Sequence, residues 1–331
     1  MGELREIFVR VLKGFRKTAV FAITTRCNCR CVMCDMHRKK PEAISLQDAE
    51  RVLDFLARNN FIAIYITGGE PSLHPNLTDI VRYARNLGIV STMTTNGTAD
   101  PDLVNELQEA GLYLLTVSLD HWDPRICEAI RKHPRIREKQ IETLRRAKDL
   151  GMRVFALAFL NPFLVRDGVD RLVKFSNVEI GVPMGFCYPV ETRVNSYRLG
   201  GTITQRQYSE MLSDAVETLH RLKGGRYDVS NLGTYVEDLA NKNSGRRPNF
   251  YCRGGQDVIY VDWRGDVYPC FLREKLFNIL EDDEPHFLKN VRCNDCFTNC
   301  FREPSLLPQI WKPHLLLKEA LCSFRTREVI L

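Results

Sequence analysis

The chain has 331 residues, of which 44% are hydrophobic and 27% are charged, and its formal net charge is +6. This composition is typical of a globular protein with a large core, and so modest a charge gives little support for a nucleic-acid partner. The sequence contains no apolar run of about 18 to 20 residues and no signal-peptide core, which excludes a transmembrane helix and predicts a cytoplasmic location.

The first predicted element is a helix within residues 1–18. Apolar residues recur there at helical spacing, and basic residues occupy the rest of the helical wheel, so we expect a basic amphipathic helix. We favour a helix that covers one end of the protein. The alternative is peripheral membrane contact through its apolar face.

From residue 19 to about residue 225 the pattern alternates between strands and helices. Six strand-helix units in succession predict an α/β fold with a parallel sheet, either open or curled into a barrel. In such folds the functional groups lie beyond the carboxyl ends of the strands. The predicted strands are 20–24, 62–67, 90–94, 114–118, 154–160 and 180–186, and the predicted helices are 46–59, 77–87, 101–110, 136–150, 166–175 and 204–222.

The first strand runs into a loop with four cysteines in eight residues. In a reducing compartment, the 12 cysteines of this chain argue for metal rather than for disulfides. Cys27, Cys31 and Cys34 form a C-x3-C-x2-C pattern, which could hold three irons of a cubane cluster and leave the fourth open. Cys29 could instead complete a structural zinc or iron site with four cysteines. The loop alone leaves both interpretations open.

Three further motifs follow the next strands. Gly68-Gly69-Glu70-Pro71 combines a glycine pair, which allows a ligand to approach the backbone closely, with a carboxylate. The proline that follows makes the backbone after this motif rigid. Asn96 follows the third strand, and the fourth strand ends in Ser118-Leu119-Asp120, where polar groups suit sugar hydroxyls. Each motif alone also fits an ordinary turn or helix cap. Their common position at the carboxyl ends of the strands is what predicts a shared site.

Together these motifs resemble the radical S-adenosylmethionine superfamily. The matching residues lie between positions 24 and 120, and the strand-helix alternation extends the resemblance to about residue 225. The resemblance implies a partial (β/α)6 barrel and a 4Fe-4S cluster whose open iron chelates S-adenosylmethionine. In this pattern Cys29 is not a ligand. The residues that carry the resemblance are Cys27, Cys31 and Cys34 as the cluster loop, Gly68, Gly69, Glu70 and Pro71 as the GGEP motif, and Ser118 and Asp120.

The same resemblance implies roles for the cofactor-binding residues. Gly68, Gly69 and Glu70 would meet the methionine amino group, and Ser118 and Asp120 would meet the ribose. Asn96 is a further candidate for cofactor binding. Met33 occupies a place often held by an aromatic residue that packs on adenine, and a second adenine contact is expected at 180–181 or 184–185. The reduced cluster would then generate a 5′-deoxyadenosyl radical that abstracts hydrogen from a substrate. A reductant such as flavodoxin or ferredoxin is an expected partner.

A second group of cysteines lies near the carboxyl terminus. Residues 226–250 are polar and predict a linker, and residues 251–331 form the predicted second domain. Strand-like residues 258–262 and 267–270 flank a turn, which predicts a hairpin between Cys252 and Cys270. A zinc ribbon fits this pattern. Given the upstream motifs, it resembles twitch and SPASM extensions, which implies one auxiliary iron-sulfur cluster held by Cys252, Cys270 and two of Cys293, Cys296 and Cys300. The isolated Cys127, Cys187 and Cys322 are expected to be structural.

These observations predict an oxidoreductase or a bond-forming radical enzyme. Only about 18 residues precede the first strand, which argues for a small-molecule or lipid-like substrate over a peptide. The apolar stretch 301–321 would either line the substrate pocket or cover the barrel. A peptide- or tRNA-modifying radical enzyme is one alternative. A non-enzymatic zinc- or nucleic-acid-binding protein is the alternative from a different class.

Overall fold

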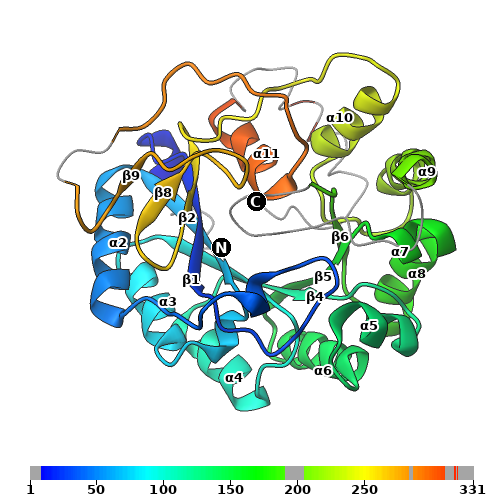
Figure 1. Cartoon of the computed structure of the whole chain (residues 1–331), viewed down its shortest axis with the longest axis horizontal. Helices are drawn as coiled ribbons and strands as arrows, with labels where there is room; N and C mark the ends of the chain where they lie inside the picture. Colours follow the sequence, from blue (N-terminus) through cyan, green and yellow to red (C-terminus); the bar gives the residue numbers. More distant parts are fainter. Residues whose placement is uncertain (1–8, 191–204, 283–285, 310–316, 318, 320–331) are drawn as a thin grey trace.

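The computed structural model describes residues 9–190, 205–282, 286–309, 317 and 319 (Figure 1). Its centre is a nine-stranded sheet in the order β6-β5-β4-β3-β2-β1-β7-β8-β9, so β6 and β9 are edge strands and the barrel is open. The six predicted parallel strands are all present in this sheet, which confirms the expected partial barrel. They are β1 (Lys17–Thr24), β2 (Phe61–Gly68), β3 (Val90–Thr95), β4 (Leu114–Ser118), β5 (Arg153–Phe159) and β6 (Met184–Cys187).

Helices cover the outer face of the sheet (Figure 1). Alternate strand residues such as Ile64, Ile66 and Met93 pack with the helices in the main core, because side chains alternate between the two faces of a strand. The opposite face of the sheet is left for the neighbouring strand residues, among them Tyr65 and Thr92. The helices of the barrel are α2 (Leu46–Arg58), α3 (Leu77–Asn86), α4 (Pro101–Ala110), α5 (Pro124–Arg131), α6 (Ile136–Asp149), α7 (Pro162–Asp167), α8 (Val169–Lys174) and α9 (Gln205–Lys223).

Two details of the predicted helices are wrong. The single helix expected at 166–175 is instead the pair α7 and α8, separated by Gly168, whose φ of 107° breaks the helix. Helix α5 was not predicted at all, because its eight residues are too few for a clear hydrophobic period. Its start does carry a capping signal, since the Asp123 side chain accepts from the backbone N–H of Arg125 and Pro124 is the first helical residue.

The sixth strand is shorter and later than expected. A π-helical turn, Phe175–Ile180, and Gly181 with a φ of 79° occupy the start of the predicted strand. Pro183 follows them, so β6 begins only at Met184. Proline has no N–H for a strand ladder, which accounts for the delayed start.

The predicted hairpin near the carboxyl terminus is confirmed. Strands β7 (Val258–Val261) and β8 (Asp266–Tyr268) pair antiparallel, and β9 (Phe277–Asn278) follows. Strand β7 also pairs in parallel with β1, with Thr18 opposite Val258 and Phe21 opposite Val261. The hairpin therefore continues the barrel sheet rather than forming a sheet of its own.

Helix α10 (Gly233–Asn243) lies inside the stretch predicted as a linker, and it is joined to α11 (Asn299–Arg302) by an ion pair. Arg302 Nη2 lies 2.7 Å from Asp238 Oδ2, and both side chains are buried. Asp238 also accepts from the backbone N–H and side-chain amide of Asn249. Such a buried pair holds its partners firmly because separating them would leave an uncompensated charge.

The predictions for the two ends of the chain can be compared with the structure only in part, because most of these residues lie outside the described ranges. Residues 9–12 are helical, whereas most of the predicted amphipathic helix, and Cys322, lie outside the described residues. Within the apolar stretch 301–321 the structure describes residues 301–309, 317 and 319, and α11 leads there into a 3-10 helix at Pro304–Gln309. None of the helices in the described parts of the chain has the length and apolar character that a membrane crossing requires.

Candidate functional site

The cysteine loop leaves the carboxyl end of β1 and lies against the end of α5. The backbone N–H of Arg30 donates to the carbonyl of Arg131 at 3.0 Å, and that of Val32 donates to Ile130 at 2.9 Å. The cysteines of this loop belong to one apolar cluster with Ile130 and with Met33, which is buried at 5% exposure. The structure therefore gathers the predicted ligands Cys27, Cys31 and Cys34 beside the residue predicted to contact adenine.

The glycine pair at the end of β2 packs against the backbone between β1 and the cysteine loop. The backbone N–H of Gly69 donates to the carbonyl of Thr24, and that of Glu70 donates to the carbonyl of Arg26, both at 2.7 Å. A Cβ atom on either Gly68 or Gly69 would overlap a carbonyl oxygen of the segment that leads into the cysteine loop. The absence of side chains thus lets the loop approach β2 closely.

Glu70 ties the glycine pair to the segment after β3. One carboxylate oxygen accepts from Thr95 Oγ1 at 2.7 Å, and the other accepts from the backbone N–H of Asn96 at 2.6 Å. Asn96 Nδ2 in turn donates to Asn28 Oδ1 at 2.8 Å and to Cys29 Sγ at 3.2 Å. Three motifs that the sequence placed at the ends of strands are therefore one hydrogen-bonded unit around the cysteine loop.

Ser118 is the last residue of β4 and Asp120 follows it two residues later, but their surroundings differ. Ser118 is 8% exposed, whereas Asp120 has no exposed surface. Both carboxylate oxygens of Asp120 accept from Arg131, from Nε at 2.5 Å and from Nη2 at 3.0 Å. In this arrangement the carboxylate is engaged inside the protein, and a ribose contact through Asp120 stays a prediction. No sequence pattern pointed to Arg131, which ends a helix that was itself unpredicted.

The thiols of the loop differ in acidity. Burial raises the pKa of Cys27 to about 12 and that of Cys34 to about 11. The pKa of Cys31 is lowered to about 7 because the Cys29 thiol donates to its sulfur and because the Arg131 guanidinium lies beside it, although burial acts in the opposite direction. At neutral pH Cys27 and Cys34 would lose their protons to solvent only when a cation binds their thiolates, as happens in metal sites.

The donors around these sulfurs suit an anionic thiolate cluster. The backbone N–H of Met36 points to Cys34 Sγ at 3.5 Å, and Arg131 Nη1 points to Cys31 Sγ at 3.8 Å. Over the described residues, no three His, Cys, Asp or Glu side chains are gathered closely enough to hold a single metal ion. In a cubane cluster each thiolate binds its own iron, so the three thiolates need not meet at one point.

The distal cysteines also converge. The backbones of Cys252 and Cys293 pair as an isolated antiparallel β-bridge. Each backbone N–H donates to the carbonyl of the other residue, with N to O distances of 3.0 and 3.1 Å. Cys252, Cys270, Cys293 and Cys300 share a second apolar cluster. Cys296 interacts electrostatically with the thiols of Cys252 and Cys270. All five predicted distal ligands are therefore brought together, and the choice among Cys293, Cys296 and Cys300 is still open.

Sequence reasoning missed Glu303 and Asn231, which lie near Cys187, a residue expected only to be structural. Cys187, at the end of β6, interacts electrostatically with Glu303 and more weakly with Asp120 and Arg131. Burial raises the pKa of Glu303 to about 7, and its Oε1 accepts from Asn231 Nδ2 at 2.6 Å. These residues are separated widely in sequence, and only the fold brings them together.

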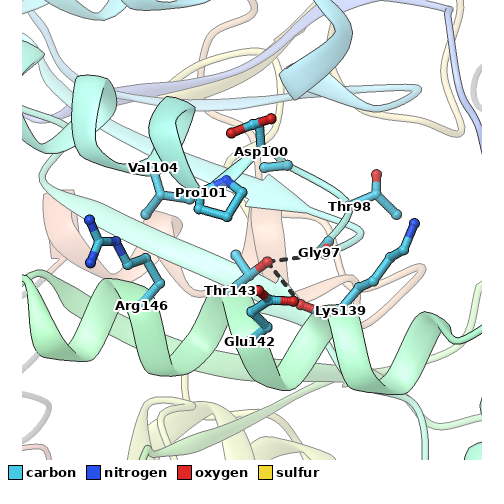
Figure 2. A pocket seen from close by; sticks show the side chains of 10 residues that line it. Gly97, Thr98, Asp100, Pro101, Val104, Lys139, Glu142, Thr143 and Arg146 are labelled. Carbon is cyan, nitrogen blue, oxygen red and sulfur yellow. Dashed lines mark hydrogen bonds between the residues drawn. The ribbon is translucent and has the colours of Figure 1, made fainter.

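A pocket of about 280 Å³ lies behind the segment after β3, between the start of α4 and the side of α6. Figure 2 shows Thr143 on α6, whose hydroxyl donates to the carbonyl of Gly97 at 3.0 Å, and Thr98 nearby. Thr98 Oγ1 also accepts from Asn28 of the cysteine loop at 2.8 Å. None of the residues predicted to bind cofactor or metal lines this pocket, so it is separate from the candidate site.

Comparisons with known proteins cover the part of the chain that carries the cysteine loop and the glycine pair. Residues 21–175 match the Radical SAM superfamily. The chain is 34% identical over 112 residues to Fe-coproporphyrin III synthase of Methanosarcina barkeri, which covers 33% of the chain and 28% of the synthase. It is 26% identical over 296 residues to GTP 3′,8-cyclase of Aquifex aeolicus, covering 83% of the chain and 88% of the cyclase. For several other GTP 3′,8-cyclases the match spans about half of the relative.

Among solved structures, SuiB of Streptococcus suis bound to S-adenosylmethionine is similar in fold. The TM-score is 0.62 at 18% sequence identity, over 84% of this chain and 68% of SuiB. At this identity the similarity concerns the fold alone. It agrees with the partial barrel and its sheet of parallel strands.

Proposed function

Because the chain is a radical S-adenosylmethionine superfamily enzyme with the superfamily domain over residues 21–175, we propose that it cleaves S-adenosylmethionine reductively at a 4Fe-4S cluster held by Cys27, Cys31 and Cys34. The loop that carries these three cysteines is fixed on one side by the end of α5 and on the other by the glycine pair, and this observation carries the proposal. When bound, the cluster supplies the electron that yields a 5′-deoxyadenosyl radical, which takes hydrogen from the substrate.

The residues around the loop would orient the cofactor. Gly68, Gly69 and Glu70 are proposed to face its methionine amino group, and Glu70 is held in place by Thr95 and Asn96. Ser118 and Asn96 offer polar groups to the ribose, and Met33 offers an apolar surface to the adenine. The family match makes the chain an enzyme, which argues against the non-enzymatic zinc alternative.

We further propose that the substrate is a polar small molecule. Tyr65 on β2, Thr92 on β3 and Thr116 on β4 alternate with core residues and therefore lie on the face of the sheet opposite the helices. Glu303 adds an acidic group near Tyr65 and Cys187. These groups favour a polar substrate over a lipid-like one. A nucleotide is a specific candidate, since the alignment over 83% of the chain is with a protein named GTP 3′,8-cyclase.

The test is anaerobic reconstitution with iron and sulfide, followed by reduction in the presence of S-adenosylmethionine. We expect a broad visible iron-sulfur band, about eight irons per chain if both clusters are cubanes, and release of 5′-deoxyadenosine. Addition of GTP tests the nucleotide candidate through its consumption. Stoichiometric zinc in anaerobically purified protein, without cofactor cleavage, would contradict the proposal.

The proposed auxiliary cluster gives a separate prediction. Replacing Cys252 and Cys270 with Ala should remove roughly half of the iron, because these two thiols are proposed ligands of the second cluster only. Cleavage of S-adenosylmethionine should remain measurable, since the cysteine loop after β1 is untouched. Iron analysis and 5′-deoxyadenosine formation check the two expectations. A variant with the full iron content would rule out the auxiliary cluster at these cysteines.

A further inference from the structure

Arg131 contacts two residues of the candidate site with different parts of its guanidinium group. Nε and Nη2 donate to the two oxygens of Asp120, while Nη1 points to the sulfur of Cys31 at 3.8 Å. The Arg131 side chain is 11% exposed and that of Asp120 is fully buried. The main-chain carbonyl of Arg131 also accepts from the backbone N–H of Arg30 in the cysteine loop at 3.0 Å. Arg131 therefore reaches the loop through both its backbone and its charge.

The guanidinium of Arg131 contacts the carboxylate of Asp120 and the sulfur of Cys31. A cation beside a metal-bound thiolate stabilises the more negative, reduced form of a cluster, and hydrogen bonds to the sulfur act in the same direction. Asp120 opposes part of this effect, because its negative charge offsets the guanidinium at close range. In a buried position such effects are weakly screened by solvent.

We propose that the buried Asp120–Arg131 pair is a positioning unit that sets the reduction potential of the iron-sulfur cluster through Cys31. This inference rests on the proposed function, since it requires a cluster on the cysteine loop. Arg131 raises the potential by donating to the Cys31 sulfur, and Asp120 both aims the guanidinium and limits its effect. The pair acts on the cluster through a ligand and is not assigned a contact with substrate.

The test is a redox titration of the reconstituted enzyme, followed by electron paramagnetic resonance of the reduced cluster in a variant that lacks the distal cluster through Cys252→Ala and Cys270→Ala. We expect Arg131→Met to lower the midpoint potential. Asp120→Asn keeps one oxygen that can accept from the guanidinium and removes the negative charge, so we expect it to raise the potential. Arg131→Lys keeps the positive charge and should fall between Arg131→Met and the parent protein. A purely structural role would move the two principal variants in the same direction, or not at all.

Arg125→Gln is the matched control. Arg125 lies on the same helix, but its side chain is 89% exposed and pairs with Asp123 at the surface, so its loss should leave the midpoint potential unchanged. If Arg131→Met fails to bind iron, the opposite displacements of Arg131→Lys and Asp120→Asn decide the question. Unchanged potentials in these variants would overturn the inference. Failure of the parent protein to assemble any cluster would instead contradict the proposed function.

Discussion

Replacing Cys27, Cys31 and Cys34 together with Ala is expected to remove about four irons per chain and to abolish formation of 5′-deoxyadenosine. All three thiols belong to the apolar cluster beside α5, and their loss leaves the loop without sulfur ligands at the proposed positions. The iron that remains should match the distal cluster. Iron and sulfide analysis of the anaerobically reconstituted variant, together with a cleavage assay under strong reductant, gives both readouts.

Cys29→Ser is the control for that experiment, because it removes the fourth thiol of the same loop. Cys29 is buried at 1% exposure, its sulfur accepts from Asn96, and its thiol donates to Cys31. A serine hydroxyl can make similar hydrogen bonds, so we expect this variant to keep its iron and its cleavage activity. Loss of iron from Cys29→Ser equal to that of the triple variant would support a site with four cysteine ligands and contradict an open iron.

The strand order of the barrel was accessible from sequence because its signals are local. Strands such as Leu114–Ser118 are short apolar runs between helical patterns, and their parallel succession follows from the alternation. The pairing of β7 with β1 was not accessible, since it joins residues about 240 positions apart. Nothing in the residues of β7 marks Thr18 and its neighbours as their partners.

The residues of the candidate site also fall into those that could be predicted from sequence and those that could not. The three cysteines and the glycine pair were found from spacing, and the fold places them together. The role of the glycines was only partly anticipated, because the backbone that approaches them in this structure is that of Thr24 to Arg26. Arg131 was missed because arginine at the end of a short helix is ordinary in sequence, and only the three-dimensional arrangement brings it to Asp120 and Cys31.

The approach of the cysteine loop to β2 leads to the second large prediction, which concerns Gly69→Ala. An alanine Cβ at this position would overlap the carbonyl oxygen of Arg26 and lie 2.6 Å from that of Thr25. Both obstacles are backbone atoms, which cannot swing aside as a flexible side chain can. The variant must therefore separate β2 from the loop, and it would weaken the two hydrogen bonds that join Gly69 and Glu70 to this segment.

We expect Gly69→Ala to lose about 1–3 kcal/mol of unfolding free energy, as overpacked sites do, and to retain little iron on the displaced cysteine loop. Denaturant unfolding and iron analysis measure the two effects, and the distal cluster should persist. Gly225→Ala is the matched control, because its Cβ would come no closer to another atom than 3.3 Å from the carbonyl oxygen of Leu222 and 3.6 Å from that of Arg221. If Gly69→Ala instead equals the control in stability and iron, the close contact between β2 and the loop is not what positions the cluster ligands.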